Sequence, residues 1–332
     1  MLLAKVQSFN EENKSGLVSI LKTDLFYNIQ SLKSNYPQLI NTLNCSQSIL
    51  DSTQLTNLMM NSNNEFSFEA RGKDWAGNAD SGLKVRIDGV KDLLKRLNKD
   101  ESLNFDSNYT IVDFLAGNGY VNQVANLILG SDKSPQFINS DLSYFMFRDA
   151  LKNGLFSVWQ SAENPFWIKS SSVDAVLYAY GTHHIQNRSK AIKEGARNLK
   201  DGGRLVIHDF EEGSPMATWF ADIVSNFSKT RHDYPHFSQQ EMFYLAENAG
   251  LKNIKIEHID DPFVIVADTK EKALYSLSKY VMDLYGLVKF NGDVNRVLSL
   301  IDQYFGIHSR QINDSQFEVK IVRNALVCSA TK

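Results

Sequence analysis

The sequence predicts an α/β fold in which a mostly parallel sheet carries helices on both of its faces. Two features of the chain support this prediction. From about residue 109, short apolar runs alternate with amphipathic helical segments, which is typical of βαβ units. The first apolar run ends in a turn that contains Gly117 and Gly119 and leads directly into a helical segment. Parallel strands joined by helical crossovers are therefore the expected framework.

The composition is that of an ordinary globular protein. The chain has 332 residues, of which 43% are hydrophobic and 22% are charged, and its formal net charge is −3. It contains no block of like charges, so we expect no nucleic-acid partner. No stretch is apolar enough to span a bilayer or to act as a signal peptide, so we expect a cytoplasmic protein without a membrane partner. Cys45 and Cys328 are too far apart to suggest a disulfide framework or a zinc motif.

Residues 1–85 differ from the rest of the chain. They are rich in Asn, Ser and Gln, and apolar residues recur at helical spacing, as in Leu21, Leu25 and Ile29. We predict short helices that break near Pro37 and form a cap, a lid or the contact surface of a homodimer. Residues 86–332 are predicted to form the core.

The core begins with an amphipathic helix whose apolar residues between positions 87 and 97 lie on one side. The alternating elements then follow in order. We expect strands at residues 109–114, 136–141, 172–180, 204–210 and 252–259, and helices at residues 119–129, 188–203 and 238–250.

The last part of the chain departs from this alternation. After an apolar run at residues 263–270, two helical segments occupy residues 272–290 and 293–306. Two strand-like runs, residues 317–322 and 324–330, end the chain. We interpret residues of about 269–310 as a helical insertion before the last strand.

The segment with the most specific signal is Ile111–Tyr120, which reads IVDFLAGNGY. A ligand that binds at the carboxyl ends of parallel strands meets this turn first, and glycines allow its backbone to approach closely. A dinucleotide site would require a third glycine or an alanine where Asn122 stands. Asp113 is also poorly placed for a pyrophosphate, whereas it suits a ligand that carries an ammonium group.

Residues 109 to about 266, together with the final strand, resemble the core of the class I S-adenosylmethionine (SAM)-dependent methyltransferases. IVDFLAGNGY matches the first motif of that family except at Leu115, where a glycine is expected. The resemblance implies a doubly wound, mostly parallel seven-stranded sheet whose last strand is antiparallel, and SAM as cofactor. It also implies that the methionine end of SAM is lined by residues of this turn, namely Asp113, Ala116, Gly117, Gly119 and Tyr120.

The resemblance extends to three later segments. Asp141, followed by Leu142, ends the second strand and is implied to hold the ribose hydroxyls. Ser161 and Ala162 occupy the third motif, where the family's usual acid for the adenine amino group is missing. The fourth segment begins at Tyr180, which is implied to contact the cofactor.

The loop after Tyr180 carries His183 and His184. In this family the loop faces the transferred methyl group, so the two histidines are the candidates for a general base. A packing role for one of the two is the alternative. Trp75, His208 and His236 are predicted to contact the substrate. A metal site around His236 is not expected, because no third ligand is evident in the sequence near it.

These observations predict a SAM-dependent methyltransferase that acts on a small-molecule metabolite, at oxygen, nitrogen or activated carbon, in specialised metabolism. The loop at residues 180–183 does not match the Asn-Pro-Pro-Tyr type used on amides and nucleic-acid bases. Three alternatives remain. They are a SAM-binding enzyme that catalyses a cyclisation or an elimination, an NAD-dependent reductase, and a non-catalytic binding protein.

Overall fold

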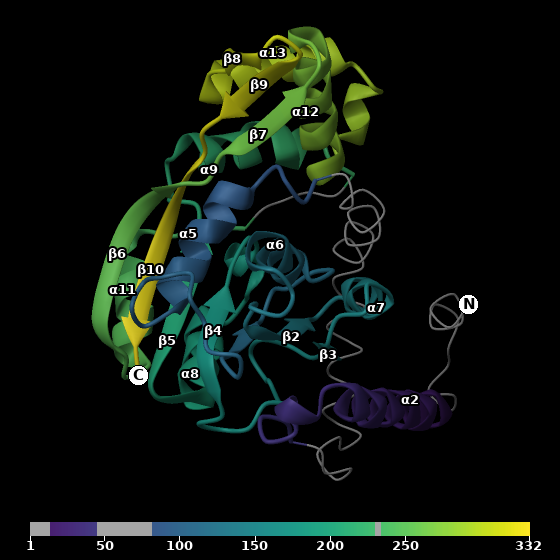
Figure 1. Cartoon of the computed structure of the whole chain (residues 1–332), viewed down its shortest axis with the longest axis vertical. Coiled ribbons are helices and arrows are strands. Elements are labelled where there is room, and N and C mark those ends of the chain that lie inside the picture. Colours follow the sequence, from purple (N-terminus) through teal and green to yellow (C-terminus); the bar gives the residue numbers. More distant parts are fainter. Residues whose placement is uncertain (1–13, 45–81, 230–233) are drawn as a thin grey trace.

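The computed structural model describes residues 14–44, 82–229 and 234–332 (Figure 1). A seven-stranded sheet in the order β3-β2-β1-β4-β5-β10-β6 forms its centre. The strands are β1 (Thr110–Asp113), β2 (Gln136–Asp141), β3 (Ser157–Trp159), β4 (Val173–Tyr178), β5 (Leu199–Asp209), β6 (Lys252–Asp260) and β10 (Asn324–Thr331). The first five pair in parallel, whereas β10 is antiparallel to both β5 and β6. The predicted fold class is confirmed.

Successive residues of β1 show why helices cover both faces of the sheet. Ile111 packs in one apolar core with α5 (Ile87–Leu97) and α6 (Tyr120–Leu129), whereas Val112 packs in a second core. Side chains alternate across a strand, so a buried strand must be apolar on both sides. The helices that cover this second face of the sheet include α7 (Tyr144–Lys152), α8 (Arg188–Asn198) and α11 (Gln239–Asn248).

A helix from the N-terminal region packs beside the β3 edge of the sheet. This helix, α2 (Lys14–Asn35), is followed by the short turn η2 (Pro37–Leu39), and Figure 1 shows it below β3. Leu25 and Ile29 belong to the same apolar core as Phe156 and Trp167. The part of this region that the structure describes therefore adds apolar cover to the core. Its role as a lid or a dimer surface stays a prediction.

The region of the expected insertion contains helices and a sheet of its own. It consists of β7 (Phe263–Ala267), α12 (Lys270–Leu284), η7 (Val288–Phe290), α13 (Val294–Phe305), β8 (His308–Asn313) and β9 (Gln316–Ile321). The three strands form an antiparallel sheet in the order β7-β9-β8. Figure 1 shows this unit at the top of the molecule, with β10 leading the chain back into the main sheet.

A short helical segment connects the accessory unit to the sheet. It comprises α9 (Pro215–Trp219), the π-helical turn η6 (Phe220–Val224) and α10 (Ser225–Phe227). The ring of Trp219 lies 5.5 Å from that of Tyr304, and the ring of Phe220 lies 5.4 Å from that of Tyr285. These aromatic contacts hold the end of α12 over the carboxyl ends of the central strands. Among the described residues, no helix combines the length and apolarity needed to cross a membrane.

Candidate active site

A cavity of about 320 Å³ lies at the carboxyl ends of the central strands. This is where ligands bind in open α/β sheets, and the volume lies within the range of small-molecule sites. The cavity brings together most of the residues that the sequence singled out. They are Ala116, Gly117, Tyr120, Asp141, Leu142, Ser161, Ala162, Tyr180, His183 and His184.

Asp141 and the turn after β1 form one hydrogen-bonded wall of the cavity. The carboxylate of Asp141 accepts hydrogen bonds from the backbone N–H groups of Gly117 and Ser143, each at 2.8 Å. Ser143, and not Asp141, is the N-cap of α7. Burial raises the pKa of Asp141 to about 6, although these hydrogen bonds oppose the shift. Asp141 therefore presents an ionised carboxylate at neutral pH.

Asp113 and Gly119 lie behind this wall and do not line the cavity. Asp113 accepts a hydrogen bond from the N–H of Leu115 at 3.2 Å, and burial raises its pKa to about 8. Gly119 has φ +83°, and a Cβ atom built there would lie 2.2 Å from Cδ1 of Leu155. The positive φ favours a glycine at this position, and any larger residue would also require the Leu155 side chain to move.

The third segment places Ser161, but not the neighbouring Gln160, at the cavity. Gln160 is fully buried, and its side-chain amide donates to Ser140 Oγ and accepts from the N–H of Trp167. Ser161 lines the cavity, and its hydroxyl accepts from the N–H of Glu163 at 3.1 Å. Ser161 is therefore the better placed of the two for a ligand.

Tyr180 lies in a strained backbone conformation at the end of β4. Its φ is +61°, the residue lines the cavity, and its buried hydroxyl has no hydrogen-bond partner among the described residues. Non-glycine residues in this region of φ cluster at functional sites. The predicted substrate residue His208 lies behind Tyr180, with ring centroids 4.5 Å apart, and does not line the cavity. Burial lowers the pKa of His208.

Two buried arginines on the cavity wall belong to a charged layer beside Tyr180. Arg86 donates to the hydroxyl of Tyr280 at 3.2 Å, and its guanidinium lies 4.9 Å from the centre of the Tyr180 ring. Arg323 pairs with the carboxylate of Asp261 and lines the same cavity. Arg323 follows an apolar strand run, and nothing in the local sequence marks it as part of a site.

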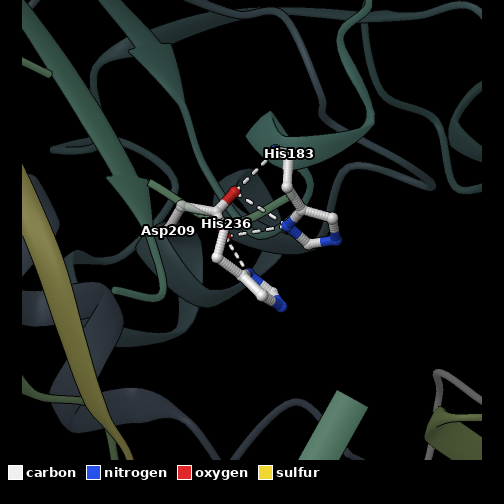
Figure 2. Close-up of side chains that lie close together, drawn as sticks. All are labelled: His183, Asp209 and His236. Atoms are coloured by element: carbon white, nitrogen blue, oxygen red, sulfur yellow. Dashed lines mark hydrogen bonds and ion pairs between the residues drawn. The ribbon is translucent and has the colours of Figure 1, made fainter. Parts of the chain in front are cut away.

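His183 and His236 face the buried carboxylate of Asp209, which ends β5 (Figure 2). Nδ1 of His183 lies 2.8 Å from both carboxylate oxygens, and Nδ1 of His236 lies 3.6 Å from Oδ1. Burial alone would raise the pKa of Asp209, but the charge and hydrogen bond of His183, followed by those of His236, hold it well below its usual range. The cluster therefore contains a permanent negative charge.

His183 and His184 line the cavity, whereas Asp209 and His236 lie behind its surface. The rest of the lining includes the aromatic rings of Phe210, Phe220 and Tyr285, together with the charged residues Lys229 and Asp283. No local sequence motif marks these three aromatic residues, because they lie far apart along the chain, directly after β5, in η6 and directly after α12. Trp75, which the sequence predicted to contact the substrate, lies outside the described residues.

Comparison with known proteins defines the family. A family model described as a methyltransferase domain matches residues 84–256, slightly more than half of the chain. The chain therefore belongs to this methyltransferase-domain family. This match confirms the identification as a class I SAM-dependent methyltransferase, and SAM is the cofactor of that class.

Two curated relatives match the core. A demethylmenaquinone methyltransferase from Thermotoga maritima is 26% identical over 167 residues, which cover 46% of this chain and 71% of the relative. The ubiquinone/menaquinone biosynthesis C-methyltransferase UbiE from Syntrophotalea carbinolica is 28% identical over 130 residues, which cover 38% of this chain and 52% of the relative. The chain thus spans only part of each relative.

Solved structures also match. The YcgJ protein from Bacillus subtilis has a TM-score of 0.48 at 16% identity, covering 74% of this chain and 98% of its own. A phosphoethanolamine N-methyltransferase from Haemonchus contortus in complex with SAM has a TM-score of 0.47 at 17% identity. The match covers 72% of this chain and 51% of that enzyme.

Proposed function

We propose that this methyltransferase transfers the methyl group of SAM to a small-molecule metabolite of specialised metabolism, at an oxygen, a nitrogen or an activated carbon. The observation that carries the proposal is that one continuous cavity joins the Gly117–Asp141 wall to the two histidines and the aromatic residues. A cavity of about 320 Å³ suits a small acceptor better than a polymer. The two curated relatives, named as quinone-pathway methyltransferases, support a small-molecule acceptor.

The two ends of the cavity have different roles in this proposal. Asp141 holds the ribose, Ser161 faces the adenine, and Gly117 lies against the methionine. The acceptor then lies between the histidines and the rings of Phe210 and Phe220, whose flat apolar surfaces suit an aromatic or unsaturated molecule. Methyl transfer is an in-line displacement at sulfonium, so holding the acceptor atom in line is the main task of the protein.

The histidine pair assists the transfer by removing the proton that the acceptor loses. The rings of His183 and His184 are 4.3 Å apart, and the ring of Tyr234 lies 4.5 Å from that of His184. His183 is held in position by Asp209. General acid–base assistance of this kind contributes roughly 10²- to 10⁴-fold to a rate.

An acceptor screen tests the proposal. The purified chain is incubated with SAM and a panel of phenols, quinols, amines and small acids, and products are followed by mass spectrometry together with release of S-adenosylhomocysteine. The expected result is an acceptor that gains one methyl group in proportion to the S-adenosylhomocysteine formed. Conversion of SAM without any methylated product would contradict methyl transfer and would favour an elimination or a cyclisation.

A further inference from the structure

We propose that His183, Asp209 and His236 bind a divalent transition-metal cation at the wall of the cavity. The proposal rests on the proposed function for the role of the ion, but not for its binding. Each residue offers one ligand atom, and the three atoms lie within 4.8 Å of one another. Figure 2 shows the two imidazoles converging on the carboxylate from the same side.

The distances fit the coordination of one ion. Imidazole nitrogen and carboxylate oxygen bind zinc at about 2.0–2.2 Å, which places neighbouring ligand atoms about 3.0–3.5 Å apart. Here the Asp209 carboxylate oxygen Oδ1 lies 2.8 Å from Nδ1 of His183 and 3.6 Å from Nδ1 of His236. The third separation, between the ligand nitrogens of the two imidazoles, is no more than 4.8 Å.

The surroundings of the carboxylate support a ligand role. Backbone N–H groups of His183 and Phe210 each donate to Asp209 at 2.7 Å, one to each oxygen. Hydrogen bonds from outer groups orient a ligating carboxylate, and each oxygen keeps a second lone pair for an ion. The side chains of Asp209 and His236 are 1% and 7% exposed, so the cluster is shielded from bulk water.

The donor set indicates the class of cation. Two imidazoles and one carboxylate suit Zn²⁺, Fe²⁺ or Co²⁺, whereas Mg²⁺ and Ca²⁺ prefer oxygen ligands. One carboxylate leaves a divalent ion with a net charge of +1, which complements an ionised acceptor oxygen. The ion would act as a Lewis acid that lowers the pKa of the acceptor. His183 is then a ligand, and His184 remains beside it to take the proton.

Metal titration of the full chain tests the site. Protein stripped with a chelator is titrated with Co²⁺, followed by visible absorption, and with Zn²⁺, followed by metal content and thermal unfolding. We expect one equivalent of either ion and a rise in melting temperature, with no competition from Mg²⁺. Asp209→Asn and His236→Gln should each weaken binding about 100-fold or more, beyond the 10- to 100-fold effect of outer partners.

The control variant is His258→Gln, which removes the imidazole of the exposed His258–Glu211 pair. It should bind like the unmodified chain. The proposal would be overturned if the unmodified chain bound no metal ion. It would also be overturned if metal binding survived in both cluster variants and was lost in His258→Gln. SAM titration of the same stripped protein separates the two proposals. SAM binding without any metal binding rejects only the ion, and metal binding without SAM binding rejects only the proposed function.

Discussion

Replacing Asp141 with asparagine should weaken the binding of SAM about 30-fold. A carboxylate has about four lone-pair positions. The backbone N–H groups of Gly117 and Ser143 occupy two of them at 2.8 Å, and that of Leu142 hydrogen-bonds the same carboxylate, so one position remains for a ribose hydroxyl. The amide of asparagine keeps only one acceptor oxygen, and its NH₂ group must face one of these donors.

The magnitude follows from the lost acceptor. A hydrogen bond to a charged group contributes about 1.5–3 kcal/mol. The loss of one such bond to the ribose, about 2 kcal/mol, corresponds to roughly 30-fold in affinity. The same variant leaves a backbone N–H poorly paired, so the free energy of unfolding should also fall by about 1–2 kcal/mol.

Calorimetric titration with SAM and with S-adenosylhomocysteine measures this effect. The matched control is Asp268→Asn, which removes one exposed carboxylate from the accessory unit and should leave the affinity unchanged. Affinities of Asp141→Asn within twofold of the unmodified chain, for a variant that unfolds cooperatively, would refute the assignment of Asp141 to the ribose.

The remaining predictions concern pH, the glycine turn and the histidines. Because the pKa of Asp141 is about 6, its carboxylate should be mostly protonated at about pH 5, and SAM affinity should be about tenfold lower there than at about pH 7. Calorimetry measures this drop, which should be absent in Asp141→Asn. Gly119→Ala should lower the free energy of unfolding by about 2–4 kcal/mol, since backbone strain adds to the clash with Leu155. The control is Gly154→Ala, because Gly154 has φ +72° but open space around it, so this variant should show the effect of backbone strain alone. Denaturant titrations measure both variants, and equal losses of unfolding free energy would contradict the clash. His183→Ala or His184→Ala should reduce kcat about 100-fold or more with little change in SAM affinity, and a parallel loss of both quantities would argue against proton transfer.

The sequence predicted the framework because its signals are local. Ile111 and Val112 face opposite sides of the sheet, and both are apolar, as expected for a parallel strand that is buried on both faces. The turn with Gly117 directly follows that strand. The short strand β3 was not predicted, because three residues show no periodicity. The antiparallel sheet of the accessory unit was not expected either, because β7 is separated by two helices from β8 and β9, which pair as a hairpin.

The acceptor end of the site could be predicted only in part. His183 was recognised because it follows a predicted strand. Asp209 and His236 join it only because β4, β5 and the segment before α11 end at the same edge of the sheet. The metal site that we propose has ligands far apart along the chain, so no spacing motif could indicate it. The close approach of Leu155 to Gly119 is a tertiary contact of the same kind.

The measurement that most directly tests the central claim is calorimetric titration of the purified chain with SAM, S-adenosylhomocysteine and NADH. We expect micromolar binding of SAM and S-adenosylhomocysteine and no heat of binding for NADH. Binding of NADH without binding of SAM would contradict the assignment of the cavity to SAM.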